Sequence, residues 1–348
     1  MEEWGRAPCR TARAARRTAH SPFRTSRSVV WVRRRLSLTE YTLSLLPAAT
    51  VATGTSAFVD AASGRNLTYS LFLRQVKSLA SSLQSLTPLS KGHVALILTP
   101  SSLHVPVLYF ALLSIGVIVA PANPLSSPSE LTHLVRLAKP VIAFATSAIT
   151  PNIPSLRFGT LLMDSPLFDS MLHNRNVEAP NKVELSQFDT AAILFSSGTT
   201  GRVKGVELTH RNFIAVIAGF NHLRAVTVAV AEEELQRVSL FTLPLFHVFG
   251  FFMLVRAVAT GDTLVFMQRF DFEGMLKAVE KYRITSMPVS PPLIVALAKS
   301  ELVKKYDLGS LKFLGCGGAP LGKEVTEAFA TKFPNVEISQ VRTTYYKG

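Results

Sequence analysis

Cysteine is scarce in this sequence. The 348 residues contain only Cys9 and Cys316, which lie at opposite ends of the chain. Two cysteines so far apart exclude a disulfide framework and a zinc knuckle, so a reducing compartment is the simpler expectation. Charged residues are also few, at 17%, whereas hydrophobic residues make up 48%. This balance excludes a disordered chain and predicts a globular protein of about two domains.

Acidic residues are nearly absent from the N-terminal region. Residues 1–40 hold ten arginines and no lysine, against only Glu2, Glu3 and Glu40, and so carry half of the formal net charge of +14. No apolar core precedes the arginines, which excludes a secretory signal. Two interpretations stay open, an organellar transit peptide and a disordered or misassigned extension. An RNA-binding arm is a weaker hypothesis because no aromatic residues alternate with the basic ones, so we expect no nucleic-acid partner.

The sequence also lacks an apolar run long enough to span a bilayer. The longest uncharged apolar segment, residues 105–120, contains Ser114 and Gly116 and falls short of the roughly 20 residues that a transmembrane helix needs. Gly116 followed by VIVA indicates the end of a helix and the start of a buried strand. We therefore expect this segment in the core, and no transmembrane segment.

From residue 41 onward, helical and strand-like patterns alternate. Thr68 is expected to cap an amphipathic helix whose apolar residues are spaced four and three apart: Phe72, Val76, Leu79, Leu83 and Leu86. Further helices are expected over 103–115, 211–220, 251–259 and 272–282, and beginning near residues 127, 291 and 323. Apolar strands are expected at 94–98, 117–120, 140–145, 191–195, 238–243, 263–267, 284–289 and 311–315. This alternation predicts an α/β fold with two related subdomains and largely parallel sheets.

A loop rich in glycine and hydroxyl residues follows one of these strands, in the stretch ILFSSGTTGRVKGVEL (193–208). Glycines let backbone N–H groups approach an anionic oxygen closely, and hydroxyls add further donors. Lys204 would add a mobile positive charge. The spacing does not fit a Walker A loop. Spacing alone leaves open both a phosphate-binding loop and a flexible linker.

Three motifs in order carry a resemblance to a known family. They are SSGTTGRVKGVELTHRN (196–212), PLFHVFG (244–250) and GCGGAPLGKE (315–324). Together they resemble the adenylate-forming superfamily, which includes acyl-CoA synthetases, luciferases and the adenylation domains of peptide synthetases. PANP (121–124) and the SPP of MPVSPPL (287–293) are similar to the plant 4-coumarate–CoA ligase-like subgroup. The resemblance covers about residues 41–340, a partial N-terminal AMP-binding domain, with an unrelated tail at 341–348 and no small C-terminal domain.

The resemblance implies a two-step acid–CoA ligase. ATP with Mg²⁺ activates a small carboxylic acid to an acyl-adenylate, and coenzyme A then takes the acyl group. Lys204 and His247 are the implied catalytic residues, and His247, Phe249, Gly317 and Gly318 the implied lining of the acid pocket. The implied nucleotide-binding residues are Ser196, Ser197, Gly198, Thr199, Thr200, Gly201, Lys204, Gly317, Gly318, Ala319 and Gln340. His210, within THRN, is expected to be structural and to open the helix after the loop.

The sequence departs from the family pattern in two places. The family continues from ISQ into GYGxTE, which helps to hold adenine and Mg²⁺, whereas this chain continues from Gln340 into VRTTYYKG. We therefore expect no metal ligand and impaired activity, and an inactive splice product with a binding or regulatory role stays open. Phe249 stands where 4-coumarate enzymes commonly have tyrosine, which favours a more apolar acid, fatty or oxylipin-like. The expected location is cytoplasm or peroxisome, unless the arginine-rich N-terminus directs the chain to an organelle.

Overall fold

The computed structural model describes residues 35–174, 179–196, 203–228 and 237–340. The chain divides into two units, residues 1–33 and 34–348, and all described residues belong to the second. The tail expected at 341–348 and nearly all of the N-terminal extension therefore lie outside the described residues.

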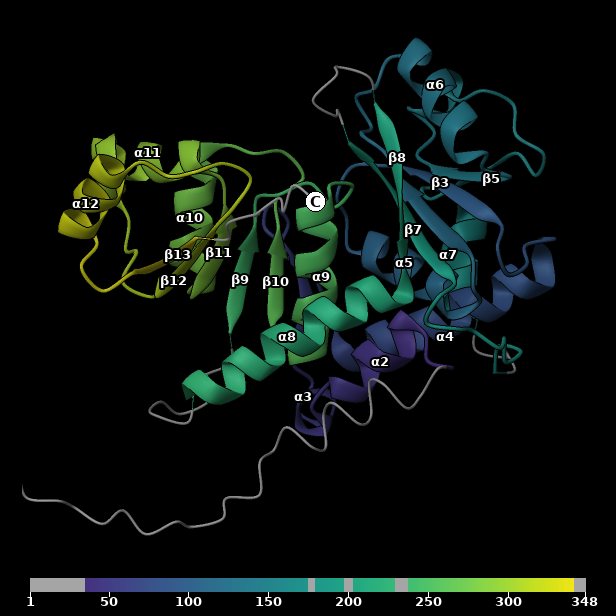
Figure 1. The fold of residues 1–348 in the computed structure, drawn as a ribbon, viewed down its shortest axis with the longest axis horizontal. Coiled ribbons are helices and arrows are strands. Elements are labelled where there is room, and N and C mark those ends of the chain that lie inside the picture. The colour runs from purple at the N-terminus through teal and green to yellow at the C-terminus, as the bar shows by residue number, and fades with distance from the viewer. Residues whose placement is uncertain (1–34, 175–178, 197–202, 229–236, 341–348) are drawn as a thin grey trace, which may run out of the picture. The chain divides into compact units, whose positions relative to one another are not determined.

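Two β-sheets form the framework of the fold (Figure 1). Sheet A has the strand order β13-β12-β11-β9-β10-β1-β2, and sheet B the order β6-β5-β3-β4-β7-β8. Neighbouring strands are parallel except for the pairs β1–β2 and β7–β8, which are antiparallel. The predicted α/β architecture with two largely parallel sheets is confirmed. The strands are β1 (Ser56–Asp60), β2 (Asn66–Thr68), β3 (Val94–Leu98), β4 (Ile118–Pro121), β5 (Ile142–Ala145), β6 (Thr160–Leu162), β7 (Thr190–Ser196), β8 (Lys204–Thr209), β9 (Val238–Phe241), β10 (Thr263–Phe266), β11 (Ser286–Val289), β12 (Phe313–Cys316) and β13 (Glu337–Gln340).

Helices connect the parallel strands, as a parallel sheet requires. They are α2 (Leu38–Leu45), α3 (Ala48–Ala52), α4 (Tyr69–Leu86), α5 (His104–Ser114), α6 (Pro128–Ala138), α7 (Pro166–His173), α8 (His210–Val228), α9 (Val248–Thr260), α10 (Phe272–Tyr282), α11 (Pro291–Lys299) and α12 (Lys323–Lys332), with short 3₁₀ turns at Thr150–Asn152 and Glu301–Lys305. The predicted cap of α4 is confirmed, because the Thr68 side chain accepts a hydrogen bond from the Leu71 N–H.

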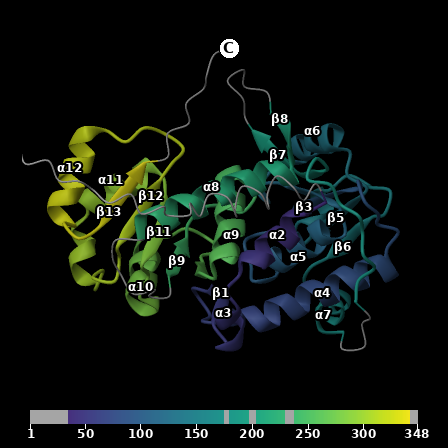
Figure 2. The same cartoon turned by 60° about the horizontal axis from the view of Figure 1, so that its bottom comes forward.

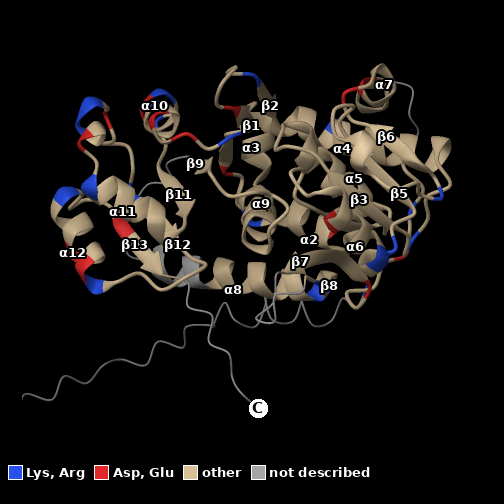
Figure 3. Ribbon diagram, turned by 90° about the horizontal axis from the view of Figure 1, so that it is seen from above, with Lys and Arg blue, Asp and Glu red and all other residues tan. Residues whose placement is uncertain are grey.

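One face of sheet A is covered by α10, α11 and α12. Side chains alternate between the two faces of a strand, so every second strand residue enters this layer. The strands contribute Val59, Leu240, Val265, Met287 and Leu314, and the helices Met275, Leu276, Val279, Ile294, Leu297 and Phe329. On their outer sides α10 and α12 carry charges of both signs (Figure 3), as expected of helices between a core and water.

The other face of sheet A is aromatic. Phe58 of β1 contacts Phe72 of α4 with ring centroids 5.1 Å apart, and Phe72 contacts Phe110 of α5 at 5.4 Å. Tyr109 of α5 stacks on Phe251 of α9 at 5.2 Å. Because α5 also contacts β4 of sheet B, this aromatic layer links the two sheets. Figure 2 shows α4 running beside α5 and α7 on the side of sheet B.

The burial of α5 explains its uniformly apolar sequence. Residues 105–113 are all buried in the fold, and Gly116 follows with φ +76°, a left-handed conformation that favours glycine. The expectation of a core segment is confirmed. Among the helices of the described residues, none has the length and apolarity needed to cross a membrane.

The ordered fold begins earlier than residue 41. Ser37 and Glu40 form a capping box, in which each side chain accepts a hydrogen bond from the other residue's backbone N–H, and α2 starts at Leu38. Leu38 and Tyr41 are buried, so the last residues assigned to the extension belong to the core. The pattern analysis also missed β1, β2, β6, β8 and β13, of which β2, β6, β8 and β13 lie at sheet edges.

Candidate active site

The predicted phosphate loop connects the two strands of a hairpin. β7 ends at Ser196 and β8 begins at Lys204, and these two residues are register partners. The hairpin therefore places the hydroxyl of Ser196 at one end of the loop and the side chain of Lys204 at the other. Lys204 is exposed to solvent. The remaining predicted residues of the loop lie outside the described residues: Ser197, Gly198, Thr199, Thr200 and Gly201.

Helix α6 supports this hairpin, a contact that the sequence analysis did not predict. His133 of α6 lies with its Nε2 3.2 Å from the carbonyl oxygen of Val203, the residue directly before Lys204. Leu137 lies beside Gly205, where an added Cβ would come within 3.1 Å of Ile193 Cγ2. Gly205 therefore lets β8 pack tightly on β7. A helix-surface histidine with no motif around it gives no sequence signal for this role.

His247 forms the N-cap of α9. Its Nδ1 accepts a hydrogen bond from the Phe249 N–H at 3.4 Å, so the proton of the neutral imidazole lies on Nε2. The side chain is exposed. Gly250 allows this arrangement, because a Cβ there would lie 2.1 Å from the Pro244 carbonyl oxygen. The sequence PLFHVFG thus folds into a tight turn that presents an N–H donor at the start of a helix.

The GCGG motif (315–318) contains the last residues of β12 and the turn that follows it. This turn lies beside Phe249, two residues after His247. The Gly317 N–H donates to the Val289 carbonyl at 3.1 Å, and a Cβ on Gly317 would lie 3.1 Å from Phe249 Cε1. Gly318 has φ +89°, which favours glycine. Two motifs about seventy positions apart in the chain are therefore in direct contact.

Ala319 and Gln340 lie at the same end of sheet A, where β12 and β13 have their carboxyl ends. Ala319 is exposed directly after the glycine turn, and Gln340, also exposed, is the register partner of Cys316 across β12 and β13. Cys316 itself is a buried free thiol, and burial raises its pKa. Because β9, β11, β12 and β13 are parallel, their carboxyl ends share one edge, where ligands bind in open α/β sheets.

His210 is the first residue of α8, as predicted. It is only 1% exposed, and its Nδ1 accepts a hydrogen bond from the Leu38 N–H at 3.0 Å. Burial, the largest cause, lowers its pKa to about 4, with a smaller contribution from Lys91, while Asp189 and Glu40 oppose the shift. Neutral His210 thus joins the start of α2 to the end of the β7–β8 hairpin.

Comparison with known proteins identifies the class that this fold and site define. The model of the family described as AMP-binding enzyme matches residues 47–345. The chain therefore belongs to the AMP-binding enzyme family.

Several plant proteins are similar to this chain. The protein 4-coumarate–CoA ligase-like 9 of Arabidopsis thaliana is 54% identical over 330 residues, which cover 91% of this chain and 58% of that protein. The 4-coumarate–CoA ligase-like 5 of Oryza sativa subsp. japonica is 46% identical over 86% of this chain and 56% of its own. The peroxisomal OPC-8:0-CoA ligase 1 of Arabidopsis thaliana is 36% identical over 82% and 54%. The chain thus spans little more than half the length of these relatives.

Solved structures share the fold. A red-emitting luciferase from Phrixothrix hirtus superposes with a TM-score of 0.74 at 25% identity, covering 86% of this chain and 59% of the luciferase. The N-terminal domain of FACL13 from Mycobacterium tuberculosis superposes with a TM-score of 0.75 at 20% identity, covering 89% of this chain and 76% of that domain. These likenesses confirm that the two sheets form the fold of an adenylate-forming N-terminal domain.

Proposed function

We propose that this chain carries the acid- and nucleotide-binding part of an acid–CoA ligase. In the first step, a carboxylate oxygen attacks the α-phosphorus of ATP, and pyrophosphate leaves. In the second step, the thiol of coenzyme A displaces AMP from the acyl-adenylate and gives a thioester. The observation that carries the proposal is the contact between Phe249, beside His247, and Gly317 at the carboxyl edge of sheet A.

The proposed roles are those that the family resemblance implies, and the position of each residue supports them. Lys204, at one end of the hairpin loop, neutralises charge on the departing pyrophosphate. His247 directs Nε2–H toward the acid or the adenylate, because its Nδ1 is engaged at the helix cap. The turn of Gly317, Gly318 and Ala319 forms the wall of the nucleotide and acid site, and Gln340 borders it. Positioning and charge neutralisation account for the first step, which needs little acid–base chemistry.

Mg²⁺ bound with ATP would supply further charge neutralisation at the phosphates. Among the described residues, no group of three histidine, cysteine, aspartate or glutamate side chains is arranged to hold a metal ion. We therefore assign no residue of this chain as its ligand and derive no step through it.

The acid that we propose is apolar and elongated rather than a 4-hydroxycinnamate. Phe249 is half-buried, and its ring lies against Gly317. The ring therefore presents carbon atoms, and no hydroxyl, to the carboxyl end of sheet A. A pocket that lacks a tyrosine hydroxyl at this position cannot hydrogen-bond the phenol of a 4-hydroxycinnamate, and so loses the large preference for that acid that such a bond provides. A relative 36% identical to this chain is named peroxisomal OPC-8:0-CoA ligase 1, and so for an acid other than 4-coumarate. Its peroxisomal name supports peroxisome beside cytoplasm as the compartment.

The test is pyrophosphate exchange into ATP by the purified chain, with octanoate, hexadecanoate or 4-coumarate as the acid. Exchange dependent on an aliphatic acid supports the proposal, and Lys204→Ala should reduce it at least tenfold. His247→Asn should also reduce it, because asparagine keeps a capping oxygen but lacks the imidazole N–H. Lys182→Ala, an exposed lysine on the connector before β7, is the matched control.

Two outcomes contradict parts of this proposal. Selection of 4-coumarate over the aliphatic acids would overturn the proposed acid class. A folded chain that binds ATP without any acid-dependent exchange would overturn the ligase proposal for this chain and favour a binding or regulatory role.

A further inference from the structure

Serine or threonine stands directly before proline at seven positions of the sequence, six of them in the part of the chain that the structure describes. The six are Thr87, Thr99, Ser127, Thr150, Ser165 and Ser290. A serine–proline or threonine–proline pair is the acceptor sequence of proline-directed protein kinases. The residue before proline is also restricted to extended backbone, the form in which a kinase holds its substrate. Each pair is therefore a candidate phosphorylation site if a kinase can reach it.

Exposure separates Ser127 from the other five. Ser127 and Ser290 are exposed, whereas the remaining four are half-buried. Ser290 follows the buried end of β11, and Leu293, three residues later, is buried again. By contrast, residues 123–130 around Ser127 include no buried residue, and Leu125 is 89% exposed. A kinase can therefore contact several residues on both sides of Ser127 without unfolding the core.

Ser127 is the N-cap residue of α6. Its backbone is extended, with φ −64° and ψ 159°, and Pro128 is the first residue of the helix. Its Oγ accepts a hydrogen bond from the Glu130 N–H at 3.3 Å and donates to Glu130 Oε2 at 3.1 Å, and this Oε2 accepts from the Ser127 N–H at 2.7 Å. These exposed hydrogen bonds hold only the first turn, and helix ends open more readily than a core. The first buried residue of α6 is Leu131, so opening this turn leaves the packing of the helix intact.

Helix α6 places Ser127 near the start of β8. Strands β4 and β7 are parallel, so their carboxyl ends lie at one edge of sheet B, and α6 is the next element after β4. His133 of α6 contacts the carbonyl oxygen of Val203, the residue before Lys204, at 3.2 Å. His133 is six positions after Ser127, a rise of about 9 Å along the helix. This rise is close to the Debye length at physiological salt, about 8 Å, so a charge on Ser127 acts on the strand that carries Lys204.

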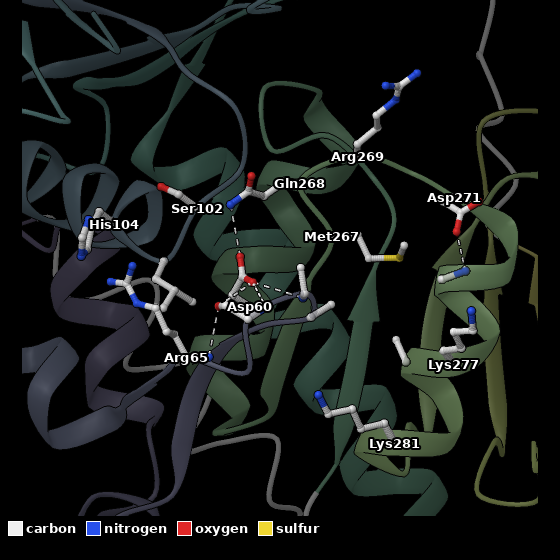
Figure 4. Close-up of a pocket in the computed structure, with 16 residues that line it drawn as sticks. Asp60, Arg65, Ser102, His104, Met267, Gln268, Arg269, Asp271, Lys277 and Lys281 are labelled. Carbon is white, nitrogen blue, oxygen red and sulfur yellow. Dashed lines mark hydrogen bonds between the residues drawn. The ribbon is translucent and has the colours of Figure 1, made fainter.

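Basic side chains surround the proposed substrate site. Lys204 stands at one end of the hairpin loop. On the side of sheet A, the wall at the carboxyl ends of β1 and β10 carries Arg65, Arg269, Lys277 and Lys281, against Asp60 and Asp271 (Figure 4). ATP, pyrophosphate and a carboxylate are anions, and clustered basic side chains attract them. A negative charge added beside the β7–β8 hairpin opposes this attraction.

We propose that Ser127 is the phosphorylation site of a proline-directed protein kinase, and that its phosphate lowers the affinity of this chain for ATP. The Oγ of Ser127 forms a bond to the γ-phosphorus of the ATP that the kinase holds, the bond from that phosphorus to the β,γ-bridging oxygen breaks, and ADP leaves. The hydroxyl proton passes to the catalytic base of the kinase.

The phosphate adds charge at the start of α6 and keeps the helix capped. A phosphoserine carries about −1.5 to −2 charges at pH 7, and it repels the Glu130 carboxylate, whose Oε2 lies 3.1 Å from Oγ. Phosphate oxygens accept from the N–H groups of the first turn in place of the hydroxyl, because a helix N-terminus favours an anion. The helix therefore stays folded, and the added charge opposes that of Lys204. The effect on ATP rests on the proposed function, whereas the phosphorylation of Ser127 does not.

The first experiment incubates the purified chain with a proline-directed protein kinase and MgATP and maps the phosphate by mass spectrometry. We expect phosphate at Ser127 of the folded chain, none at this position in Ser127→Ala, and an unchanged amount at Ser127 in Ser290→Ala. Ser290 is the matched control, because it is exposed and its side chain makes no capping hydrogen bond. Thermal unfolding checks that each chain is folded. The proposal is overturned if a folded chain takes up no phosphate at Ser127, or takes it up only after urea has unfolded the chain.

The second experiment separates the effect of charge from that of capping. Ser127→Asp and Ser127→Asn both keep a good N-cap and differ by one negative charge. Isothermal titration calorimetry should show ATP binding to Ser127→Asp about two- to threefold more weakly than to Ser127→Asn at about 0.01 M salt, where the Debye length is about 30 Å. The two affinities should be equal at about 1 M salt, where the Debye length is about 3 Å. The phosphorylated chain should lose more affinity than Ser127→Asp.

Two results are kept apart by this design. Equal ATP affinities of the two variants at low salt, together with an unchanged affinity after phosphorylation, would contradict the proposed effect on ATP. A wild-type chain that does not bind ATP would instead count against the proposed function, and the mass spectrum would still decide whether Ser127 is modified.

Discussion

A side chain at position 317 fits only if the ring of Phe249, which contacts Gly317, shifts by a few tenths of an ångström. An added Cβ would lie 3.1 and 3.3 Å from Phe249 Cε1 and Cζ, so Gly317→Ala should push the ring away. We expect a loss of about 1–3 kcal/mol in the free energy of unfolding, as for other overpacked sites, and weaker acid binding. Urea unfolding measures the first effect.

Two further variants make this prediction specific. Gly219→Ala in α8 is the control, because it adds a Cβ with nothing within 4 Å and, as a Gly→Ala change inside a helix, should not lower stability. Phe249→Leu should offset much of the Gly317→Ala loss, so that the double mutant loses less stability than the sum of the two single mutants. An additive double mutant would show that the ring and the glycine do not constrain each other.

His210 makes the stability of the fold depend on pH. Its pKa is about 4 in the folded chain and about 6.5 when unfolded, so between these values the unfolded chain binds more protons. The free energy of unfolding should therefore fall as the pH falls from about 6.5 to about 4, by up to roughly 3 kcal/mol from this residue. Above pH 6.5 the contribution is complete.

Urea unfolding at pH 7.5 and pH 4.5 checks this dependence. His210→Asn supplies an oxygen that can accept the Leu38 N–H but does not titrate, so its stability should change less between the two pH values. His104, whose pKa is also lowered, remains in both proteins and cancels in the comparison. Equal changes in wild type and variant would contradict the assignment.

At the scale of elements, α6 contacts the β7–β8 hairpin where β8 begins. His133 Nε2 lies 3.2 Å from the Val203 carbonyl oxygen, and one hydrogen bond of this kind contributes about 0.5–1.5 kcal/mol. His133→Ala should weaken pyrophosphate binding about two- to tenfold and lower the free energy of unfolding by no more than about 1.5 kcal/mol. Thr132→Ala, which loses only a hydrogen bond to Pro128 within α6, is the control. If wild type and His133→Ala bind pyrophosphate equally tightly, α6 does not contribute to pyrophosphate binding.

The sequence predicts interior elements better than edges. The pattern of α10 is recovered from residue 272 to residue 282, because its apolar face is continuous and Asp271 supplies a cap. β8 and β13 are missed, because each is an edge strand with mostly exposed residues and so lacks an apolar signal.

The site divides in the same way. The residues within the three motifs are predicted from the sequence, and their role in a site stays a prediction, although the structure brings Phe249 and Gly317 together. The contact of His133 is not predicted, because it depends on which helix the topology places beside the start of β8. In the sequence, a single histidine on α6 looks like ordinary helix surface.

At the scale of the whole molecule, the aromatic layer should make the two sheets unfold together. Phe72 is fully buried and contacts both Phe58 of sheet A and Phe110 of α5. Phe72→Ala should cost about 3–5 kcal/mol and raise hydrogen exchange equally in residues 94–98 of sheet B and 263–266 of sheet A. Leu86→Ala, at the exposed end of the same helix, should change neither. Faster exchange in one sheet alone would show that the sheets are independent units.

The buried thiol of Cys316 also makes it possible to measure how often β12 opens. A maleimide reacts with a thiolate, so a sulfur that is buried beside the glycine turn, with a raised pKa, reacts only when β12 opens. Peptide mapping gives the alkylation rate at Cys316. This rate therefore measures how often the strand that leads into the GCGG turn opens. A ligand that binds at the turn should make these openings rarer and slow the alkylation, so Cys316 reports occupancy of the site without any introduced cysteine.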